Sequence, residues 1–343
     1  MTKRLRVLVV DDSAFVRKVL REILTASPDI EVVGIARDGL EALEKVRELA
    51  PDLMTLDLVM PNLDGLGVLD VLAQSGGPRV LIVSNSAAES ELALAALERG
   101  AIDIVNKPTP LATDRLYELR QELLAKVRAV ASVERAPARA SEVSPVPAVR
   151  SAVCTRSLVV IGASTGGPHA IAYFLAALPR DFPLPIAVAL HMPAGYTDAL
   201  ARRLDATCAI EVLEAREGLA LAPGRAVIAC GGSHLTLLRD RQGALHAKVG
   251  GGRTDTLHFP SVDVLFESAV ACAGAGVIAL VLTGMGSDGT RGATKIRKAG
   301  GLVLTESESS CVVYGMPRAV VEAGQSDGNA PLQQLPALLL QRV

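Results

Sequence analysis

The sequence predicts an α/β protein with two doubly wound domains joined by a linker. Three observations support this prediction. Both halves of the chain contain short apolar runs, typical of buried parallel strands, that alternate with stretches of helical periodicity. Between the halves, residues 131–154 are rich in Ala, Pro, Ser, Glu and Arg. The length of 343 residues corresponds to about two domains, each large enough to bury a hydrophobic core.

The pattern in the first half of the sequence predicts five strand–helix units. The clearest helical stretches are 14–25, 40–49 and 89–99. The apolar runs predicted as strands begin at Arg6 and continue at 30–36, 53–58, 80–84 and 102–105. In a doubly wound sheet, chemistry gathers at the carboxyl ends of the strands, so the polar residues at these ends are functional candidates.

Five polar residues follow these strands: Asp11, Asp12, Asp57, Ser84 and Lys107. Crowded carboxylates repel one another unless a hard cation lies between them, and an all-oxygen site suits Mg²⁺ better than zinc. The lysine would balance anionic oxygens. Solvated charges would explain any one of these residues, but they explain poorly five at successive strand ends. The residues therefore predict a Mg²⁺ site at this sheet edge.

A proline-containing tether separates the two predicted domains. A helical run at 115–130 is followed by a segment with Pro137, Pro145 and Pro147, which reads as an exposed linker. We place a first domain at 1–125, an interdomain linker at 126–154 and a second domain at 155–343. Such a linker holds two domains close without fixing their angle, so docked and undocked arrangements are both physically available.

The second domain contains a candidate nucleophile, Ser164. The stretch 158–168, LVVIGASTGGP, is an apolar strand followed by the G-x-S-x-G pattern, which presents a serine hydroxyl on a sharp strand-to-helix turn. The same turn also suits phosphate binding. A dinucleotide site would need an acidic residue at the end of the next strand, but 185–190 ends in His191. A histidine there is what a base for Ser164 requires, although a lone histidine is more often structural.

Asp288 is the candidate third member. It lies in the glycine-rich segment TGMGSDGT that follows the apolar run 276–282. Its carboxylate could reach the far ring nitrogen of His191, and backbone N–H groups around Met285 could form part of an oxyanion hole. Equally, Ser287 or Asp288 could cap a helix over 289–298. The spacing leaves both explanations open.

The other histidines are weaker candidates. His169 follows Ser164 on the next helix, which turns its ring away from the hydroxyl. His234, His246 and His258 lie in loop-like or edge contexts. We therefore expect surface or capping roles for them.

Composition argues against several classes of protein. The formal net charge of −2 gives no electrostatic reason to bind nucleic acid. Five widely spaced cysteines predict buried free thiols instead of a zinc site or a disulfide framework. The N-terminal apolar run is too short for a signal peptide, and the longest apolar run, 269–283, is too short to span a bilayer. We expect a cytoplasmic protein that does not insert into a membrane.

Three segments of the first domain, VVDDS, LDLVMPNLDGL and GAIDIVNKP, resemble a two-component response-regulator receiver domain over about 7–124. The resemblance implies a flavodoxin-like fold with a five-stranded parallel sheet of order 2-1-3-4-5. It implies that Asp57 accepts a phosphoryl group from a histidine kinase. It also implies that Asp11, Asp12 and Asp57, with the backbone carbonyl of Val59, hold Mg²⁺.

The same resemblance assigns the phosphoryl contacts and shows one departure. Lys107 would pair with the phosphoryl oxygens, and Ser84 would be the switch hydroxyl. Receivers usually carry an aromatic residue at the position of Ile104, whose swing couples phosphorylation to a changed surface. We therefore expect the relay from Asp57 to depend on Ser84 and the neighbouring loop.

Segments of the second domain resemble the catalytic domain of the chemotaxis protein-glutamate methylesterase family, CheB, over about 157–324. The segments are GASTGGP, HMP with YTDALARRL after it, PSVDVLFES, TGMGSDGTRG and SSCVVYGMPRAV. The resemblance implies a doubly wound, mainly parallel α/β domain. It implies a triad of Ser164, His191 and Asp288, with the backbone N–H of Met285 as the oxyanion donor.

The resemblance also implies an activity. The implied protein is a phosphorylation-activated serine hydrolase that demethylates glutamyl methyl esters, and deamidates glutamines, on methyl-accepting chemoreceptors. This activity would mediate sensory adaptation. A CheA-type histidine kinase would be the phosphodonor. Mg²⁺ would serve phosphoryl transfer only, and ester hydrolysis would need no cofactor. The protein would act as a monomer, and in the family the unphosphorylated receiver covers the catalytic groove.

Two departures bear on substrate preference. The family commonly has a basic residue before the Pro-Ser-Val-Asp segment, where this chain has His258 and Phe259, and Cys230 replaces the proline of a Pro-Gly-Gly turn. His258 would contact the acidic face of a substrate helix or merely pack. The alternative functions are the same chemistry in a non-flagellar chemosensory pathway, or a phosphorylation-gated receptor-binding module with little catalysis. A DNA-binding output is disfavoured because the chain lacks a helix-turn-helix segment and a basic excess.

Overall fold

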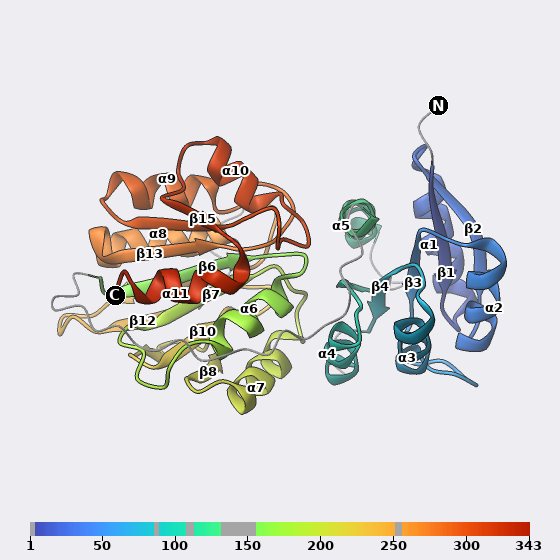
Figure 1. The fold of residues 1–343 in the computed structure, drawn as a ribbon, viewed down its shortest axis with the longest axis horizontal. Helices are drawn as coiled ribbons and strands as arrows, with labels where there is room; N and C mark the ends of the chain where they lie inside the picture. The colour runs from blue at the N-terminus through green and yellow to red at the C-terminus, as the bar shows by residue number, and fades with distance from the viewer. Residues whose placement is uncertain (1–3, 86–88, 108–112, 132–155, 251–255) are drawn as a thin grey trace. The chain divides into compact units, whose positions relative to one another are not determined.

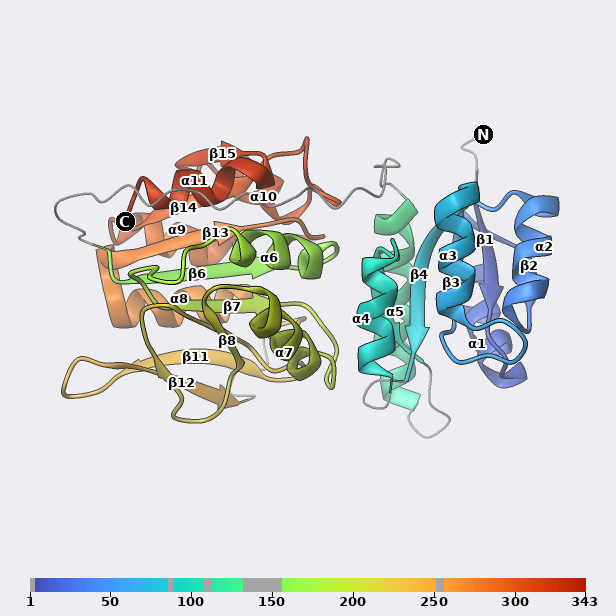
Figure 2. The same ribbon diagram turned by 60° about the horizontal axis from the view of Figure 1, so that its bottom comes forward.

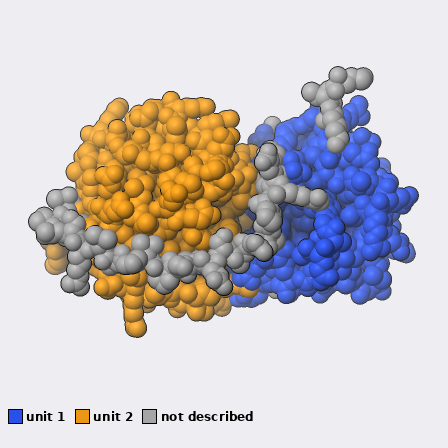
Figure 3. Space-filling model, viewed as in Figure 1, with its two compact units in different colours: residues 1–140 blue, residues 141–343 orange. Residues whose placement is uncertain are grey.

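The computed structural model describes residues 4–85, 89–107, 113–131, 156–250 and 256–343. They belong to two compact units, Met1–Ala140 and Ser141–Val343, coloured separately in Figure 3. Residues 132–154 of the predicted linker lie outside the described residues. Helix α5 (Thr113–Ala131) continues past residue 125, and the domain boundaries stay a prediction.

The first unit contains a five-stranded parallel sheet of order β2-β1-β3-β4-β5, which confirms the expected topology. Its strands are β1 (Leu5–Val10), β2 (Ile30–Ala36), β3 (Leu53–Leu56), β4 (Arg79–Ser84) and β5 (Asp103–Asn106). The helices that alternate with them are α1 (Ala14–Thr25), α2 (Gly39–Leu49), α3 (Gly65–Ser75), α4 (Ser90–Glu98) and α5 (Figure 1). Leu53 and Leu81 of the central strands pack with Leu123 and Val127 of α5 in one buried core.

Polar side chains decide where the first three helices begin. The Ser13 hydroxyl accepts the N–H of Val16 at the start of α1 (3.4 Å). Asp38 Oδ1 accepts the N–H of Glu41 at the start of α2 (2.9 Å), and Asp64 caps α3 in the same way. Each cap satisfies a backbone donor that the first turn of a helix leaves without an intrahelical acceptor.

The second unit is built on a seven-stranded sheet of order β15-β14-β13-β6-β7-β10-β8, and every pair in it is parallel. The strands are β6 (Leu158–Ala163), β7 (Ile186–Leu190), β8 (Glu211–Glu214), β10 (Arg225–Ile228), β13 (Val277–Val281), β14 (Leu302–Glu306) and β15 (Gly328–Ala330). The predicted doubly wound, mainly parallel fold is confirmed. A separate antiparallel sheet, which the sequence did not predict, has the order β11-β12-β9.

Helices cover both faces of the large sheet (Figures 1 and 2). On one face a single core joins alternate strand residues to α8 (Val262–Ala273), α9 (Thr290–Lys298) and α10 (Met316–Glu322). The same core includes β9 (Ala220–Leu221), β11 (His234–Arg239) and β12 (Leu245–Gly250). On the other face lie α6 (Gly167–Ala176), α7 (Thr197–Thr207) and α11 (Leu335–Leu340).

The strand order reverses at β6. The chain passes from β6 to β7 on one side, and later to β13 on the other side of β6. In an open α/β sheet such a reversal leaves a crevice at the carboxyl ends of the strands, where ligands bind. The loops after β6, β7 and β13 are therefore the place to look for a site.

Two further expectations can be compared with the described residues. Cys208, Cys230, Cys272 and Cys311 are free thiols, as predicted, but each is half-buried instead of buried, and Cys154 lies outside the described residues. Within the described ranges, no helix combines the length and the apolar character that crossing a membrane requires.

Candidate active site and phosphorylation site

Three loops meet at the carboxyl edge of the seven-stranded sheet. Ala163 ends β6 and pairs with Leu190, which ends β7, so Ser164 and His191 follow neighbouring strands at the same level. The His191 N–H donates to the Ala163 carbonyl (3.0 Å), and the Ser164 N–H donates to the carbonyl of Thr283 after β13 (3.0 Å). Strand register thus brings the candidate nucleophile and the candidate base together.

The turn after Ser164 has the geometry of a nucleophile elbow. The Gly167 N–H donates to the Ser164 carbonyl (2.7 Å), and Gly166 adopts a φ of 79°. A Cβ atom at Gly166 would lie 2.5 Å from the side chain of Val312, so glycine is required both by conformation and by space. Ser164 is only 7% exposed, which is less than the sequence pattern predicts.

Asp288 binds the candidate base. Its Oδ2 lies 2.8 Å from Nε2 of His191, and its oxygens also accept the Ser261 hydroxyl (3.0 Å) and the N–H groups of Val262 (2.8 Å) and Asp263 (2.9 Å). Burial alone would raise the pKa of Asp288, but the interactions with His191 and these amides outweigh it and hold that pKa far below its ordinary value. The carboxylate is therefore an anion.

Asp288 does cap a helix, as the alternative explanation holds, but it caps a different helix from the one expected. Its oxygens bind the first turn of α8 and not that of α9. The α9 amides of Gly289 (3.0 Å) and Gly292 (2.7 Å) donate instead to Oδ1 of Asp263, in the first turn of α8. The two helices thus exchange capping carboxylates, and Oδ2 of Asp288 binds both the Val262 N–H and His191.

The imidazole of His191 is oriented through Nε2. Because the ionised Asp288 can only accept a hydrogen bond, Nε2 carries the proton and Nδ1 of the neutral ring is an acceptor. Nδ1 is buried and has no hydrogen-bond partner among the described residues, so the bond to Ser164 is not closed in this structure. This orientation is the reverse of that in the serine protease triad, where Nδ1 faces the aspartate.

The structure corrects the expectation for His234, and it shows that His258 packs, which is one of the two alternatives left open for it. His234 is 2% exposed, accepts the N–H of Ser261 at Nδ1 (3.2 Å) and stacks on Phe259. His258 stacks on the ring of His191 itself, with 4.0 Å between ring centroids. His169 is exposed, as expected. No periodic pattern marks His234 or His258, because their contacts join segments that are far apart in the chain.

The loop after β13 approaches the serine closely. A Cβ atom at Gly284 would lie 2.7 Å from Cβ of Ser164, so the approach depends on glycine. The Gly284 carbonyl accepts the N–H groups of Gly315 (3.0 Å) and Met316 (2.8 Å), which fixes the loop. The N–H of Met285 makes no hydrogen bond within the described part of the chain, which is consistent with the predicted oxyanion donor.

The first unit gathers three carboxylates and a lysine at its own strand edge. Asp11, Asp12 and Asp57 each offer an oxygen within 4.8 Å of the others. Nζ of Lys107 lies 2.7 Å from Asp57 and 3.2 Å from Asp11. Burial raises the pKa of Asp57 to about 6, against the hydrogen bond from Lys107. Burial also raises the pKa of Asp11.

This donor set fits Mg²⁺, because it consists of hard oxygen ligands whose crowding a divalent cation would relieve. Asp11, Asp12 and Asp57 could hold the ion. The N–H of Val59 donates to Oδ1 of Asp57 (3.3 Å), so the Val59 backbone adjoins the cluster. The contact of its carbonyl with the metal stays a prediction.

The candidate switch hydroxyl already has an acceptor. The Ser84 hydroxyl donates to Oε2 of Glu89 (2.5 Å), and the N–H of Asn85 donates to the same oxygen (3.0 Å). Glu89 immediately precedes α4. The carboxylate therefore links the end of β4 to the start of α4. Residues 86–88 of the loop between them lie outside the described residues.

Ile104 is held in place from two sides. Its side chain is 1% exposed, and its carbonyl accepts Nζ of Lys126 from α5 (2.6 Å). The same ammonium group pairs with Asp103 (3.0 Å). A buried aliphatic side chain with a clamped backbone cannot make the swing that an aromatic residue makes at this position.

Comparison with protein families agrees with both sites. The family model described as CheB methylesterase matches residues 159–339, and the response regulator receiver domain matches residues 7–119. The first match covers more than half of the chain, and it contains the elbow, His191 and Asp288. This chain belongs to the CheB methylesterase family.

Similarity to named CheB relatives extends over whole chains. A Myxococcus xanthus protein named protein-glutamate methylesterase/protein-glutamine glutaminase 5 is 59% identical and covers 99% of this chain and 98% of that protein. A Thermotoga maritima protein named protein-glutamate methylesterase/protein-glutamine glutaminase is 40% identical and covers 100% of both. The crystal structure of the Thermotoga maritima CheB methylesterase catalytic domain is 40% identical, covers 55% of this chain and 99% of that structure, and has a TM-score of 0.53.

Sequence reasoning about this CheB-family chain missed Glu306, the last residue of β14. Its side chain is wholly buried; Oε2 accepts the N–H of Thr283 (2.8 Å) and Oε1 accepts the Ser310 hydroxyl (2.8 Å). Thr283 in turn binds the elbow, since its hydroxyl donates to the Thr165 carbonyl (2.9 Å). Burial raises the pKa of Glu306. Its position at a strand end was the one available signal.

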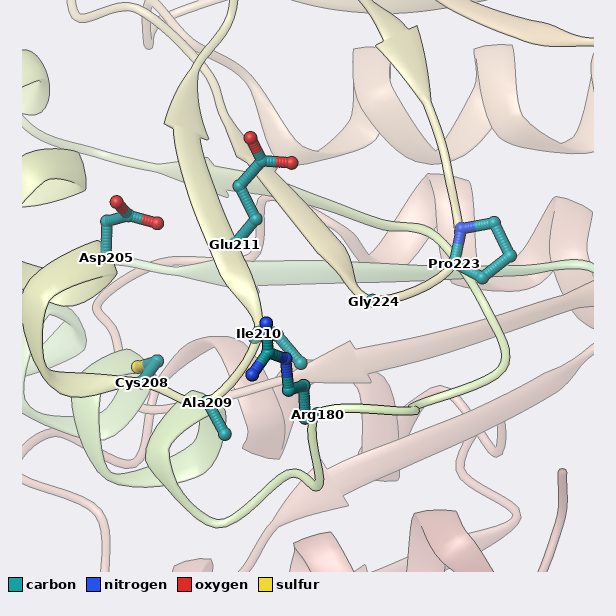
Figure 4. A pocket seen from close by; sticks show the side chains of 8 residues that line it. All are labelled: Arg180, Asp205, Cys208, Ala209, Ile210, Glu211, Pro223 and Gly224. Carbon is teal, nitrogen blue, oxygen red and sulfur yellow. The ribbon is translucent and has the colours of Figure 1, made fainter.

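A surface pocket of about 330 Å³ in the same unit is not part of this site (Figure 4). It lies at the amino ends of β8 and β10, opposite the edge that carries Ser164. Its carboxylates have structural partners: Asp205 accepts the N–H of Val212 (2.9 Å), and Glu211 pairs with Arg225 (2.6 Å). The pocket therefore offers no competing assignment.

The substitution Glu306→Gln tests the charge of this buried group. A carboxyl whose pKa is raised by folding contributes stability below its unfolded pKa, and this contribution is lost as pH rises through the folded pKa. Glutamine keeps an acceptor for Thr283 and carries no charge. We expect the free energy of unfolding of the variant to rise relative to the wild type as pH increases from about 4 to 8.

Chemical denaturation of the second unit at several pH values provides the measurement. Glu308→Gln, two residues along and exposed, is the matched control and should follow the wild type. Parallel pH profiles for the wild type and Glu306→Gln would show that Glu306 keeps its ordinary pKa.

Proposed function

We propose that this chain is a phosphorylation-activated serine hydrolase that demethylates glutamyl methyl esters, and deamidates glutamines, on methyl-accepting chemoreceptors. The observation that carries the proposal is the pairing of His191 with Asp288 beside Ser164, in a chain similar over its full length to proteins named methylesterase and glutaminase. This activity would serve sensory adaptation. The alternative of a phosphorylation-gated receptor-binding module with little catalysis has no support from these relatives.

Acylation begins with attack of the Ser164 oxygen on the ester carbonyl carbon of the glutamyl side chain. The serine proton passes to Nδ1 of His191, the ring nitrogen that has no other partner within the described chain. The oxyanion that forms accepts the N–H of Met285. Asp288 stabilises the imidazolium through Nε2 and keeps the ring in the required tautomer.

Collapse of the tetrahedral intermediate breaks the bond between the carbonyl carbon and the methoxy oxygen. The methoxy group leaves as methanol with the proton from His191. Water then gives a proton to His191 and attacks the acyl carbon. The bond between that carbon and the Ser164 oxygen breaks, and His191 returns the proton to Ser164 as the glutamate side chain is released. Deamidation follows the same steps with ammonia as the leaving group.

In the first unit, Asp57 is the proposed phosphoacceptor. Asp11, Asp12 and Asp57, with the Val59 carbonyl, would hold Mg²⁺, which neutralises phosphoryl oxygens when it is bound. The buried ammonium group of Lys107 would pair with the phosphoryl group, which is consistent with its present position beside Asp57.

We propose that Ser84 transmits the signal by exchanging acceptors. Its hydroxyl proton is now donated to Glu89 and would be donated to the phosphoryl group on Asp57 after phosphorylation. One proton has one strong acceptor at a time, so the exchange would remove the Ser84 hydrogen bond from Glu89 and leave only that of the Asn85 N–H at the start of α4. This route would replace the aromatic swing that Ile104 cannot make.

The proposed partners follow from this scheme. Methyl-accepting chemoreceptors are the substrate, and a CheA-type histidine kinase is the phosphodonor. We propose a cytoplasmic monomer as the active form. Neither nucleic acid nor direct membrane insertion has a part in the scheme.

The substitution Ser164→Ala should abolish ester hydrolysis, because no other group can form the acyl-enzyme. We expect methanol release from methylated receptor membranes to fall by about 10⁴-fold or more. Ser75→Ala, which removes an exposed hydroxyl from the end of α3, is the control and should leave the rate unchanged. Activity that survives in Ser164→Ala would disprove the nucleophile assignment.

The substitution Asp57→Asn should abolish activation by phosphorylation. With a small phosphodonor and Mg²⁺, we expect wild-type methanol release to rise by about 5-fold or more, the lower end of typical coupling between sites. Asp57→Asn should show no rise, whereas Asp70→Asn, on the surface of α3, should respond like the wild type. A response in Asp57→Asn would place the phosphoacceptor elsewhere.

The substitution Glu89→Ala should partly activate the enzyme without phosphodonor, because it removes the acceptor that holds Ser84. We expect the ratio of stimulated to basal methanol release to fall by about 2-fold, because basal release rises and stimulated release does not. Glu91→Ala, in the first turn of the same helix, tests the loss of a charge at α4 and should keep the wild-type ratio. An unchanged ratio in Glu89→Ala would exclude the exchange of acceptors.

A further inference from the structure

The catalytic imidazole has a second imidazole against its face. The rings of His191 and His258 have centroids 4.0 Å apart and planes inclined by 23°, which is a stacked arrangement. His258 lies three residues before Ser261, the residue that caps α8. The reaction scheme above gives His258 no part.

The segment that carries His258 also holds the partner of His191. In the stretch 258–263, the Ser261 hydroxyl and the N–H groups of Val262 and Asp263 all donate to Asp288. The same short segment therefore contacts the face of the imidazole and fixes the carboxylate at its edge. These two contacts are at right angles to each other, because stacking is perpendicular to the ring and the hydrogen bond lies in its plane.

The segment is itself anchored to β11. The ring of Phe259 stacks on His234 with 4.5 Å between centroids, and the Ser261 N–H donates to Nδ1 of the same histidine (3.2 Å). Nε2 of His234 lies 3.2 Å from the hydroxyl of Thr256. His234 is almost fully buried. The contacts of Thr256 and Phe259 with this histidine fix the chain on both sides of His258.

We propose that His258 is a positioning residue for ester hydrolysis, an inference that rests on the function proposed above. One hydrogen bond at Nε2 leaves the His191 ring free to tilt about that bond. A ring stacked on its face removes this freedom and keeps Nδ1 directed at Ser164. When His191 takes the serine proton, its positive charge lies against the π face of His258, which is a favourable arrangement for a cation as long as His258 is the neutral imidazole.

The proposal requires an aromatic face at position 258 and predicts a defect in kcat. His258→Leu keeps a side chain of similar bulk without a π face, and we expect kcat for methanol release to fall about ten-fold, which corresponds to about 1.4 kcal/mol. KM should stay unchanged, since the residue acts through His191 and not on the substrate. His258→Phe restores the face and should keep kcat within about 2-fold of the wild type.

His246→Leu is the matched control, since it removes an exposed imidazole of the same unit that pairs with Asp240. It should leave kcat and KM unchanged. Full kcat in His258→Leu, or a rise in KM alone, would overturn the proposal. Equal loss in the Leu and Phe variants would overturn it as well, because an aromatic face would then not be what matters.

A measurement independent of activity separates this inference from the proposed function. In the full-length protein labelled at histidine, the NMR signals of the His191 ring should shift in His258→Leu, because the ring current of the stacked partner is lost. The His246→Leu signals should match those of the wild type. A wild-type protein that releases no methanol would overturn the proposed function, whereas unshifted His191 signals would overturn the stack as a feature in solution.

Discussion

The catalytic edge of this protein depends on the hydrogen bonds of one carboxylate, that of Asp288. Its two oxygens accept the ring of His191, the Ser261 hydroxyl and two backbone N–H groups from the first turn of α8. His191 follows the end of β7, and the other donors lie at the beginning of α8. The Asp288 carboxylate therefore fixes the distance between this strand end and this helix. A carboxylate offers about four lone-pair sites, and the helix terminus carries partial positive charge. Asp288 can therefore bind the His191 ring and cap α8 at the same time.

Burial and the groups that donate to a carboxylate together decide the direction in which its pKa moves. Asp288 and Glu306 are both largely buried near the elbow, but their pKa values move in opposite directions. Asp288 has four donors, one of them on a ring that becomes cationic during the reaction. Glu306 accepts the Thr283 N–H and the Ser310 hydroxyl and has the Cys311 thiol beside it, and none of these donors becomes cationic. The site thus keeps a firm negative charge only where a positive charge must form.

The sequence predicts those parts of the structure that depend on chain order and strand ends. Apolar runs located the five strands of the first sheet and β6, β7 and β13 of the second, and the rule that chemistry gathers at the carboxyl ends brought Ser164, His191 and Asp288 to one edge. The small antiparallel sheet and the stacking of His258 could not be predicted in this way. They depend on contacts between distant segments whose residues carry no periodic signal. The cap of α9 was assigned to the wrong carboxylate for a related reason, because the exchange with Asp263 requires two helices to start side by side.

In the first unit, the ends of β4 and β5 are held by interactions of different strength, which bears on how the unit can respond to a phosphoryl group. On the side of β5, the Ile104 backbone is clamped by the buried ammonium of Lys126, which is also paired with Asp103, and moving either partner would leave a buried charge uncompensated. On the side of β4, a hydroxyl and a carboxylate share one hydrogen bond, which a stronger acceptor can take over. Breaking a buried ion pair is far more costly than exchanging the acceptor of a hydroxyl. The start of α4 is therefore held by a less costly interaction than β5 is.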